Sequence, residues 1–484
     1  MILRISLTIL GLLLLASGLR MYELAGNNLS EDESITLFLI NGYKVEGHHD
    51  FKVLTELPES FNREDIRKQK TYRNVVDASI RHNGNSFGYH LLLSWWTKVF
   101  GNTNYAIRFL SLIFGVLTVV LGYYFARQLF NERTALIAGV LLCMHPLLVE
   151  FGQLARAYVP ATFFVLLSTY SLYQISVSKR HLWLHIPLYV VAVLITAFCH
   201  YLVLYVLIAH ILLVLFFHSH KKALIQYSIM AVFMLGLFSV WWYNGGREGE
   251  KWNNHEFSLR ASEIMSPETS PGKGILQSTI SIFGDNTSSR VKELWLGLIY
   301  LIIPGIFLYF AFERIRKSEY FRQAMFVLFP IVLYFVFVIV GIFFLPAEQV
   351  FDPHYSSFAL PFACILLAFG FDRMNAPGGA LRILAYPGLF VMLFVMFVSL
   401  FPEFFLRDTQ SSARFPYHQA ADQIEKQSGQ ADEVVFGSKK HALLTNFYIN
   451  KKTEIRERID STIPEGEMRI MKNGEMLSGY SFQE

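Results

Sequence analysis

The chain begins with an apolar run at residues 2–20, ILRISLTILGLLLLASGLR, and the acidic stretch Leu29-Ser30-Glu31-Asp32-Glu33 follows shortly after it. The run is long enough to cross a bilayer as a helix, because about 20 apolar residues span roughly 30 Å of hydrocarbon. Membrane interfaces favour Trp, Tyr, Lys and Arg, so a carboxylate cluster beside a membrane exit is poorly explained by anchoring. We therefore expect chemistry at the membrane surface.

The composition extends the membrane interpretation to the whole chain. Of the 484 residues, 53% are hydrophobic and 15% are aromatic. The mean hydropathy is +0.37, and one soluble core of this size does not use so much apolar material. The net charge of +4 does not indicate a nucleic-acid partner. Cys143, Cys199 and Cys364 all fall inside apolar runs, which argues against disulfides.

Eleven apolar runs predict an all-α polytopic membrane fold. They lie at residues 2–20, 105–126, 134–151, 159–177, 182–200, 201–217, 225–243, 294–312, 324–345, 356–371 and 384–401. The turn inside 182–217 is hardly visible in the sequence. The first run could instead be a cleaved signal peptide, with Arg4 before a leucine-rich centre. We expect an uncleaved span, because the apolar segment is long for a signal peptide.

Basic loops predict how the chain crosses the membrane. With eleven spans, the basic residues of the short loops on one face fall on the same side as Arg4, which the positive-inside rule makes the cytoplasm. They are Arg127, Arg133, Lys179, Arg180, Lys221, Lys222, Arg314, Arg316, Lys317, Arg322, Arg373 and Arg382. An odd number of spans then puts the C-terminus outside, in the periplasm of a multi-pass inner-membrane protein. Arg156 stands out, because the short loops of the external face carry almost no other Lys or Arg.

Three external regions remain, at about 21–104, 244–293 and 402–484. The last region has a helical pattern at 417–424 and a strand pattern at 433–437. We therefore expect a transmembrane catalytic domain at 1–401 and a small external α/β domain at 402–484. Two apolar pieces of the first region, 35–40 and 91–100, are too short to span, and we expect both helices to lie along the outer leaflet.

Asp32 and Glu33 are the candidate catalytic residues. Neighbouring side chains on a helix point about 100° apart, so one acid would face a substrate while the other orients or pairs with it. A carboxylate held in a partly dry site has its pKa raised toward the range of a general base. The alternative is structural: an acidic turn in which Ser30 or Asp32 caps the helix that follows.

The turn Gln153-Leu154-Ala155-Arg156-Ala157-Tyr158 lies between two apolar runs. A guanidinium is permanently charged and binds phosphate oxygens in a bidentate way, so Arg156 could hold the phosphate of a lipid. The alternative is an Arg that reaches toward ordinary lipid headgroups. Further candidates have the same predicted depth, although each taken alone is an ordinary interface residue: Arg108, His200, His354 and Tyr355.

Metal and nucleotide chemistry are not expected. His48, His49 and Asp50 do not have the spacing of a recognisable metal site. The sequence places no Walker loop, Rossmann glycine fingerprint or nucleophile elbow in a fitting context.

Three parts of the sequence support a family resemblance. Asp32-Glu33 after the first span resembles the acidic motif of the GT-C superfamily of lipid-phosphate-dependent glycosyltransferases. The stretch from Arg108 through Arg127-Gln128-Leu129-Phe130 and His145-Pro146 to the Arg156 turn resembles the branch that holds the protein O-mannosyltransferases and the aminoarabinose transferase of lipid A. His200-Tyr201 matches a recurring pair. The resemblance covers about 1–400 in layout and is specific at about 28–36 and 85–160.

Two positions depart from the family pattern. Where members often have a second acid followed by paired prolines, this chain has the stretch Asn83-Gly84-Asn85-Ser86-Phe87-Gly88-Tyr89-His90. Where members have an Arg-Tyr pair before a late span, this chain has His354-Tyr355.

The resemblance implies a sugar donor linked to a polyprenyl phosphate, an external acceptor that is a lipid, glycan or protein, and inversion at the anomeric carbon. It also implies that Asp32 is the base, that Glu33 supports it, and that Arg156 with Tyr158 binds the donor phosphate. Further donor contacts would come from Arg108, His200, His354 and Tyr355, and acceptor contacts from Asn83, Asn85 and Tyr89. No cofactor, metal or nucleic acid is implied.

Two other functions stay open on sequence. One is a transporter or flippase of lipid-linked or small polar substrates, but transporters place ionisable groups near the bilayer midplane, whereas the candidate groups here cluster at one outer face. The other is a ligase or polymerase that moves a whole glycan from polyprenyl pyrophosphate. Only the identity of the donor would distinguish it.

Overall fold

The computed structural model describes residues 2–25, 29–46, 52–56, 60–61, 70–82, 84, 86–200, 204–218, 221–249, 251, 279–280, 282, 294–316, 320–341, 353–376, 382–405, 416–448, 455–460 and 462–482. Contacts between residues divide the chain into two compact units. The helical unit comprises Met1–Tyr22, Ser111–Asn244 and Phe257–Phe404. The mixed unit comprises Glu23–Leu110, Gly245–Glu256 and Phe405–Glu484. The domain boundary predicted at 401/402 stays a prediction.

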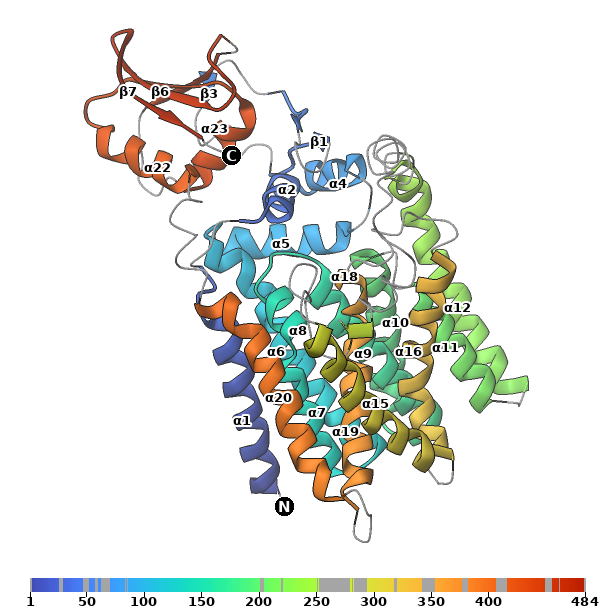
Figure 1. Cartoon of the computed structure of the whole chain (residues 1–484). Coiled ribbons are helices and arrows are strands. Elements are labelled where there is room, and N and C mark those ends of the chain that lie inside the picture. The colour runs from blue at the N-terminus through green and yellow to red at the C-terminus, as the bar shows by residue number, and fades with distance from the viewer. Residues whose placement is uncertain are drawn as a thin grey trace. The chain divides into compact units, whose positions relative to one another are not determined.

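The helical unit is built from helices that lie side by side (Figure 1). Its described helices are α1 (Ile2–Met21), α6 (Asn104–Leu129), α7 (Glu132–Met144), α8 (Pro146–Gly152), α9 (Tyr158–Tyr173), the π-helical turn η1 (Gln174–Ser178), α10 (Leu182–Cys199), α11 (Leu204–Phe217), α12 (Lys221–Trp241), the π-helical turn η3 (Trp242–Gly246), α15 (Leu294–Arg316), α16 (Phe321–Gly341), α18 (Pro353–Ser356), α19 (Leu360–Met374) and α20 (Arg382–Phe405). The first turns of α6, up to Leu110 and including Arg108, belong to the mixed unit. Helix α9 packs against α10, α19 against α7 and α15, and α11 against α16.

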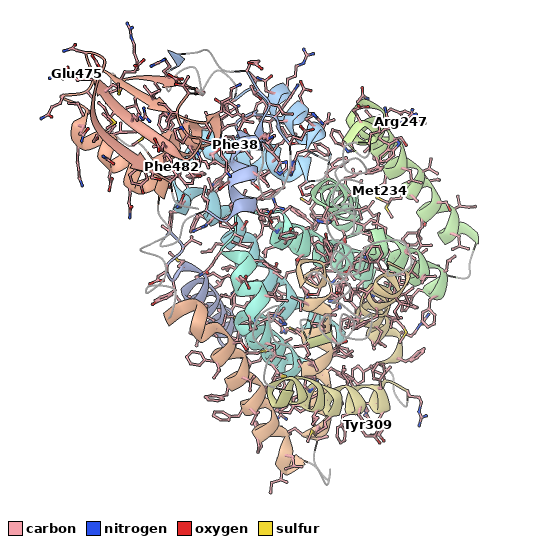
Figure 2. The ribbon with its side chains drawn as sticks, turned by 45° about the horizontal axis from the view of Figure 1, so that its top comes forward. Phe38, Met234, Arg247, Tyr309, Glu475 and Phe482 are labelled. Carbon is pink, nitrogen blue, oxygen red and sulfur yellow. The ribbon has the colours of Figure 1, made fainter. Side chains whose placement is uncertain are left out.

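Each of the eleven predicted apolar runs overlaps a helix of this unit. Among the described residues, five helices are long and apolar enough to cross a membrane, and the count rises to six if α7 and α8 form one bent span. The five are Asn104–Leu129, Leu182–Cys199, Leu224–Gly249, Phe321–Val340 and Arg382–Leu400. Large apolar side chains such as Tyr309 on α15 point outward from the helices (Figure 2). The total of eleven spans stays a prediction.

The run predicted as one span at 134–151 is two helices, α7 and α8, with a bend of 56° between them. The bend lies at His145-Pro146, where His145 has an extended backbone (φ −61°, ψ 118°). Proline has no N–H to donate and disfavours a helical conformation in the residue before it. A second helix can start directly after the bend, because proline is well suited to the first position of a helix.

The mixed unit joins the chain between the first two long helices to the C-terminal tail. Its helices are α2 (Glu31–Ile40), α4 (Tyr72–Arg81), α5 (Phe87–Phe100), α22 (Pro416–Gln427) and α23 (Lys439–Tyr448). Its strands are β1 (Val45–Glu46), β2 (Lys52–Val53), β3 (Ser60–Phe61), β4 (Glu433–Phe436), β5 (Arg456–Ile459), β6 (Glu467–Lys472) and β7 (Glu475–Ser481). The short apolar pieces predicted at 35–40 and 91–100 lie on α2 and α5, and the helix and strand predicted in the tail correspond to α22 and β4.

A small sheet of order β3-β5-β4-β6-β7 forms the centre of the tail (Figure 1). Strands β4 and β5 are parallel, and every other neighbouring pair is antiparallel. Asn473 and Gly474 connect β6 to β7 with positive φ values of 51° and 83°, which is the Asn-Gly hairpin turn that suits the twist of the strands. The edge strand β3 comes from residues 60–61, so the chain between α1 and α6 completes the sheet of the tail.

One hydrophobic cluster connects α2 to this sheet. It contains Ile35, Phe38 and Leu39 of α2 together with Val434 of β4 and Phe482 after β7. Phe38 and Phe482 are labelled in Figure 2. The apolar side of the helix that follows the acidic stretch is therefore part of the same core as the tail.

Candidate active site

Helix α2 starts at the acidic stretch, and its first turn is closed by a capping box. Ser30 is the N-cap, and its hydroxyl accepts a hydrogen bond from the N–H of Glu33 at 3.3 Å. The Glu33 carboxylate accepts in return from the N–H of Ser30 at 2.9 Å. Such a box satisfies N–H groups that a helix otherwise leaves unpaired. The structural role considered for Ser30 is thus present, and it engages Glu33 rather than Asp32.

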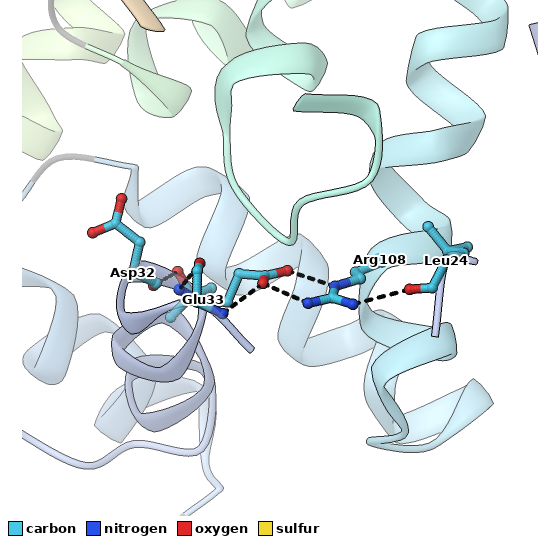
Figure 3. A network of polar contacts seen from close by, with 6 residues as sticks. Leu24, Asp32, Glu33 and Arg108 are labelled. Atoms are coloured by element: carbon cyan, nitrogen blue, oxygen red, sulfur yellow. Dashed lines mark hydrogen bonds and ion pairs between the residues drawn. The ribbon is translucent and has the colours of Figure 1, made fainter. Parts of the chain in front are cut away.

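The Glu33 carboxylate also forms a buried, bidentate ion pair with Arg108 of α6 (Figure 3). Arg108 donates from Nε to Oε1 at 2.8 Å and from Nη2 to Oε2 at 2.7 Å. Its Nη1 donates to the carbonyl of Leu24 at 3.0 Å. Both side chains are almost fully buried, with exposed fractions of 4% for Arg108 and 0% for Glu33. Arg108, predicted as a donor-phosphate ligand, therefore has Glu33 as its partner in this structure.

Asp32 has a different environment from its neighbour. Its carboxylate points away from the Glu33–Arg108 pair (Figure 3), as the helical geometry predicts. The residue is half-buried, and its backbone carbonyl accepts from the hydroxyl of Thr36 at 2.9 Å. One acid is consequently fixed by an ion pair, and the other is presented on a different side of the helix.

Arg156 lies in the turn between α8 and α9 of the helical unit. Its Nη2 donates to the Tyr158 hydroxyl at 3.4 Å, and its guanidinium carbon lies 5.5 Å from the centre of the Tyr158 ring. The Arg156 carbonyl accepts from the hydroxyl of Ser111 at 3.4 Å. Arg156 is half-buried, and its guanidinium is supported by the Tyr158 side chain.

Aromatic rings continue from Arg156 into the helical unit. The ring of Tyr158 lies 6.0 Å from the ring of His200, and His200 lies 5.7 Å from Tyr355 and 5.5 Å from Phe358. The structure thus brings together predicted residues from three separate parts of the sequence: Arg156 with Tyr158, His200, and Tyr355. The side chain of His354 lies outside the described residues.

The residues predicted to contact an acceptor are described only in part. Asn83 and Asn85 lie outside the described residues. Tyr89 is buried on α5, next to the ring of His90, and His90 Nδ1 is 2.9 Å from the Ser79 hydroxyl. His48, His49 and Asp50 also lie outside the described residues, so the expected absence of a metal stays a prediction.

Lys70 is a further candidate site residue, because it is a lysine with a lowered pKa, and the sequence alone did not indicate it. Its Nζ donates to Thr97 Oγ1 at 2.7 Å and to Asn102 Oδ1 at 3.3 Å. Burial, and to a smaller extent the positive charge of Lys98, lower the pKa of Lys70 from its ordinary 10.5 to about 8. Lys98 itself lies over the ring of Tyr72, with Nζ 3.7 Å from the ring centre.

Comparison with known sequences identifies a related family. The family described as dolichyl-phosphate-mannose-protein mannosyltransferase matches residues 85–243. An uncharacterized protein of Aquifex aeolicus (strain VF5) is 32% identical over 107 residues, which make up 22% of this chain and 21% of that protein. The chain thus aligns with about a fifth of the length of that relative.

Comparison with solved structures identifies the fold. ArnT from Cupriavidus metallidurans bound to undecaprenyl phosphate is 14% identical, with a TM-score of 0.55 over 92% of this chain and 84% of that chain. The apo oligosaccharyltransferase of Archaeoglobus fulgidus is 11% identical, with a TM-score of 0.48 over 92% of this chain and 60% of that chain.

The likeness to ArnT shows the fold: the chain folds as that solved structure does. Its long apolar helices suit a multi-pass membrane protein. Residues 85–243 are similar to the dolichyl-phosphate-mannose-protein mannosyltransferase family, and this segment includes Arg108 and the whole Arg156 turn. The resemblance predicted from the sequence is therefore confirmed.

Proposed function

We propose that this chain is an integral membrane glycosyltransferase that moves a sugar from a polyprenyl-phosphate-linked donor to an acceptor on the external face of the membrane. The observation that carries the proposal is the arrangement of three residues inside the segment 85–243 that matches the family. The Arg156 guanidinium lies over the ring of Tyr158, and the Tyr158 ring lies next to the ring of His200. The undecaprenyl phosphate bound to ArnT supports a polyprenyl phosphate as the lipid part of the donor.

The membrane arrangement that we propose has eleven spans, a cytoplasmic N-terminus and an external C-terminus, with the tail as a small external α/β domain. Helices on all eleven apolar runs support the spans. The side on which Arg4 and the basic loops fall supports the orientation. This arrangement gives the acidic stretch and the Arg156 turn the same side of the membrane.

Asp32 is proposed as the base. The acceptor oxygen attacks the anomeric carbon, Asp32 takes the proton of the acceptor hydroxyl, and the bond between the anomeric carbon and the phosphate oxygen breaks. The electron pair of that bond leaves with the polyprenyl phosphate, and attack from the opposite face inverts the anomeric carbon. The half-buried carboxylate, which points away from the ion pair beside it, suits this role.

Glu33 and Arg108 are proposed to position Asp32 rather than to touch the reacting atoms. Their bidentate pair and the capping box fix the first turn of α2, from which Asp32 projects. A carboxylate held in this way loses less orientational freedom when the acceptor binds.

Arg156 and Tyr158 are proposed to bind the donor phosphate. A phosphate leaving group needs its charge stabilised more than it needs a proton, and a guanidinium supplies two parallel N–H donors for this purpose. Around this pair, His200, His354 and Tyr355 would complete the pocket for the donor, and Asn83, Asn85 and Tyr89 would contact the acceptor. Because Arg156 supplies the positive charge, we expect no metal requirement.

The test is a transfer assay in detergent with a polyprenyl-phosphate-linked sugar. Asp32→Asn should lower turnover by about a hundredfold to ten-thousandfold, which is the range of a lost general base. Asp77→Asn is the matched control, because Asp77 is also a half-buried acid on a helix of the mixed unit. A chelator should leave the rate unchanged. Full turnover by Asp32→Asn would show that Asp32 is not the base. Lipid-linked substrate that crosses the membrane of proteoliposomes without transfer of the sugar would instead indicate a flippase.

A further inference from the structure

The bend at His145-Pro146 leaves two carbonyls at the end of α7 without their usual partners. In a continuous helix the carbonyl of residue i accepts from the N–H of residue i+4. The partner of Leu142 would be Pro146, which has no N–H. The partner of Cys143 would be Leu147, which belongs to α8 beyond the 56° bend. Buried carbonyls in this situation need another donor.

Arg20, near the end of α1, supplies that donor. Its Nη2 donates to the Leu142 carbonyl at 3.1 Å, and its Nη1 donates to the Cys143 carbonyl at 3.3 Å. Nη1 also donates to the Ala16 carbonyl of its own helix at 3.2 Å. The Arg20 side chain is completely buried. A buried guanidinium is costly, so its use here indicates a demand for this particular geometry.

Two glycines make room for the guanidinium. A Cβ atom at Gly115 of α6 would lie 2.9 Å from Arg20 Nε, and a Cβ atom at Gly152 of α8 would lie 3.2 Å from Arg20 Cδ and Nε. Distances this short force a neighbour to shift. The Arg20 side chain therefore packs directly against the backbones of α6 and α8, in space that side chains at these two positions would fill.

Gln153 makes the reciprocal connection. Its Nε2 donates to the carbonyls of Leu19 at 3.4 Å and Arg20 at 3.3 Å in the last turn of α1, and to the carbonyl of Tyr22, directly after α1, at 2.9 Å. Arg20 thus caps α7, and the residue that directly follows α8 caps α1. Gln153 is also the first residue of the turn that carries Arg156.

We propose that Arg20 and Gln153 are positioning residues that hold the Arg156 guanidinium in place for the donor phosphate. The inference rests on the proposed function, in which Arg156 binds that phosphate. The Arg156 turn is fixed at its start by Gln153 and at Arg156 itself by Ser111, so a shift of α1 against α8 displaces the guanidinium. Displacements near 1 Å can cost about a hundredfold in a site that depends on orientation.

The first variant pair uses the glycines. Gly115→Ala places a methyl group against Arg20 while it improves helix propensity, so the fold should be retained. Gly11→Ala on α1 is the matched control, because a Cβ atom there meets nothing within 4 Å. The second pair is Gln153→Met with Gln128→Met as control, since Gln128 is exposed on α6. Arg20→Met completes the set where it folds.

The readout is the affinity of the purified full chain for undecaprenyl phosphate, measured beside the melting temperature. We expect Gly115→Ala and Gln153→Met to bind this probe about tenfold to a hundredfold more weakly, measured well below the melting temperature of each variant. Gln153→Met should also melt somewhat lower than its control, because the carbonyls near the end of α1 lose a donor. In an Arg156→Lys background the same changes should cause no further loss, because the group that they position has already been replaced.

Wild-type affinity in both variants would overturn the inference, and so would an undiminished loss in the Arg156→Lys background. If the wild-type chain neither bound undecaprenyl phosphate nor transferred sugar from its conjugate, the proposed function would fail and this inference with it. That outcome differs from a wild-type chain that binds while the variants bind equally well.

Discussion

Glu33 and Arg108 are 75 residues apart in the chain, and they form a bidentate ion pair that is almost completely buried. The carboxylate also closes the capping box of α2 through the N–H of Ser30. One side chain therefore links the start of the helix that presents Asp32 to the start of α6. Glu33 is held by an ion pair and a cap, whereas the carboxylate of Asp32 points away from that pair.

Glu33→Gln should destabilise the protein strongly. The amide removes the negative charge and leaves Arg108 buried without an ionised partner, and breaking a buried pair in this way costs about 3–5 kcal/mol. The measurement is thermal unfolding in detergent. Glu46→Gln is the control, because Glu46 pairs with Arg81 at the surface, where such a pair contributes about 0–1 kcal/mol. Equal losses of stability from both substitutions would show that the buried pair contributes no more to folding than the surface pair.

The sequence predicted that Asp32 and Glu33 point in different directions, but it did not predict that Glu33 pairs with Arg108. Helical geometry requires Asp32 and Glu33 to point in different directions, and the structure has them so. The pairing of Glu33 with Arg108 depends on how α2 packs beside α6, which no local pattern encodes. Arg108 was predicted instead as a phosphate ligand because a basic residue at the start of a span suits either role.

The remaining candidates divide in a similar way. Arg156, Tyr158, His200 and Tyr355 were predicted to share one depth because each lies at an end of an apolar run, and the structure connects them through ring contacts. Arg20 was not identified, because a basic residue at the end of a span is ordinary in sequence. Its importance follows from the carbonyls that Pro146 leaves unpaired on another helix.

The pairing of residues 60–61 with the tail could not be predicted from the sequence either. Helix α22 and strand β4 were predicted from local periodicity. Strand β3 is only two residues long, and its pairing of Ser60 with Arg458 joins positions that are far apart in the chain. Such a short strand has no periodicity of its own, so only the tertiary structure reveals it.

Arg156→Lys should raise the KM for the lipid-linked donor by about tenfold to a hundredfold, because a lysine keeps the charge but loses the bidentate fork that matches phosphate. Turnover at saturating donor should fall less. Donor-concentration series in detergent provide the measurement. Arg316→Lys is the control, since Arg316 is exposed at the end of α15. An unchanged KM in the Arg156 variant would mean that the guanidinium does not bind the donor.

Lys70 should make stability depend on pH. Its pKa is lowered to about 8 in the folded state from an ordinary 10.5, so the unfolded chain binds more protons between these values. The free energy of unfolding therefore gains a contribution from Lys70 as the pH rises from about 8 to 10.5. Below pH 8 the folded protein carries the full cost of burying the charge.

Unfolding of wild type and Lys70→Met at several pH values measures this effect. The pKa of Lys70 in the folded state is about 8. The free energy of unfolding of the wild type relative to the variant should therefore increase from about pH 8 to 10 and change little from about pH 6 to 7.5. Lys439→Met provides a control, because the ion pair of Lys439 with Glu56 is long, at 3.7 Å, and the Glu56 side chain is 93% exposed. A relative stability that did not change with pH would contradict a lowered pKa for Lys70.

Phe38→Ala should destabilise the mixed unit and lower turnover together. Phe38 is fully buried in the cluster that joins α2 to the tail, and loss of a buried phenyl ring costs about 3–5 kcal/mol. The same helix presents Asp32, so a loosened α2 should orient the carboxylate less well. Met476→Ala is the matched control, because Met476 belongs to the same unit but is 60% exposed on β7. Thermal unfolding and the transfer assay, run on both variants, decide the outcome. A large drop in melting temperature with normal turnover at low temperature would show that the core of the tail supports the fold without helping to orient Asp32.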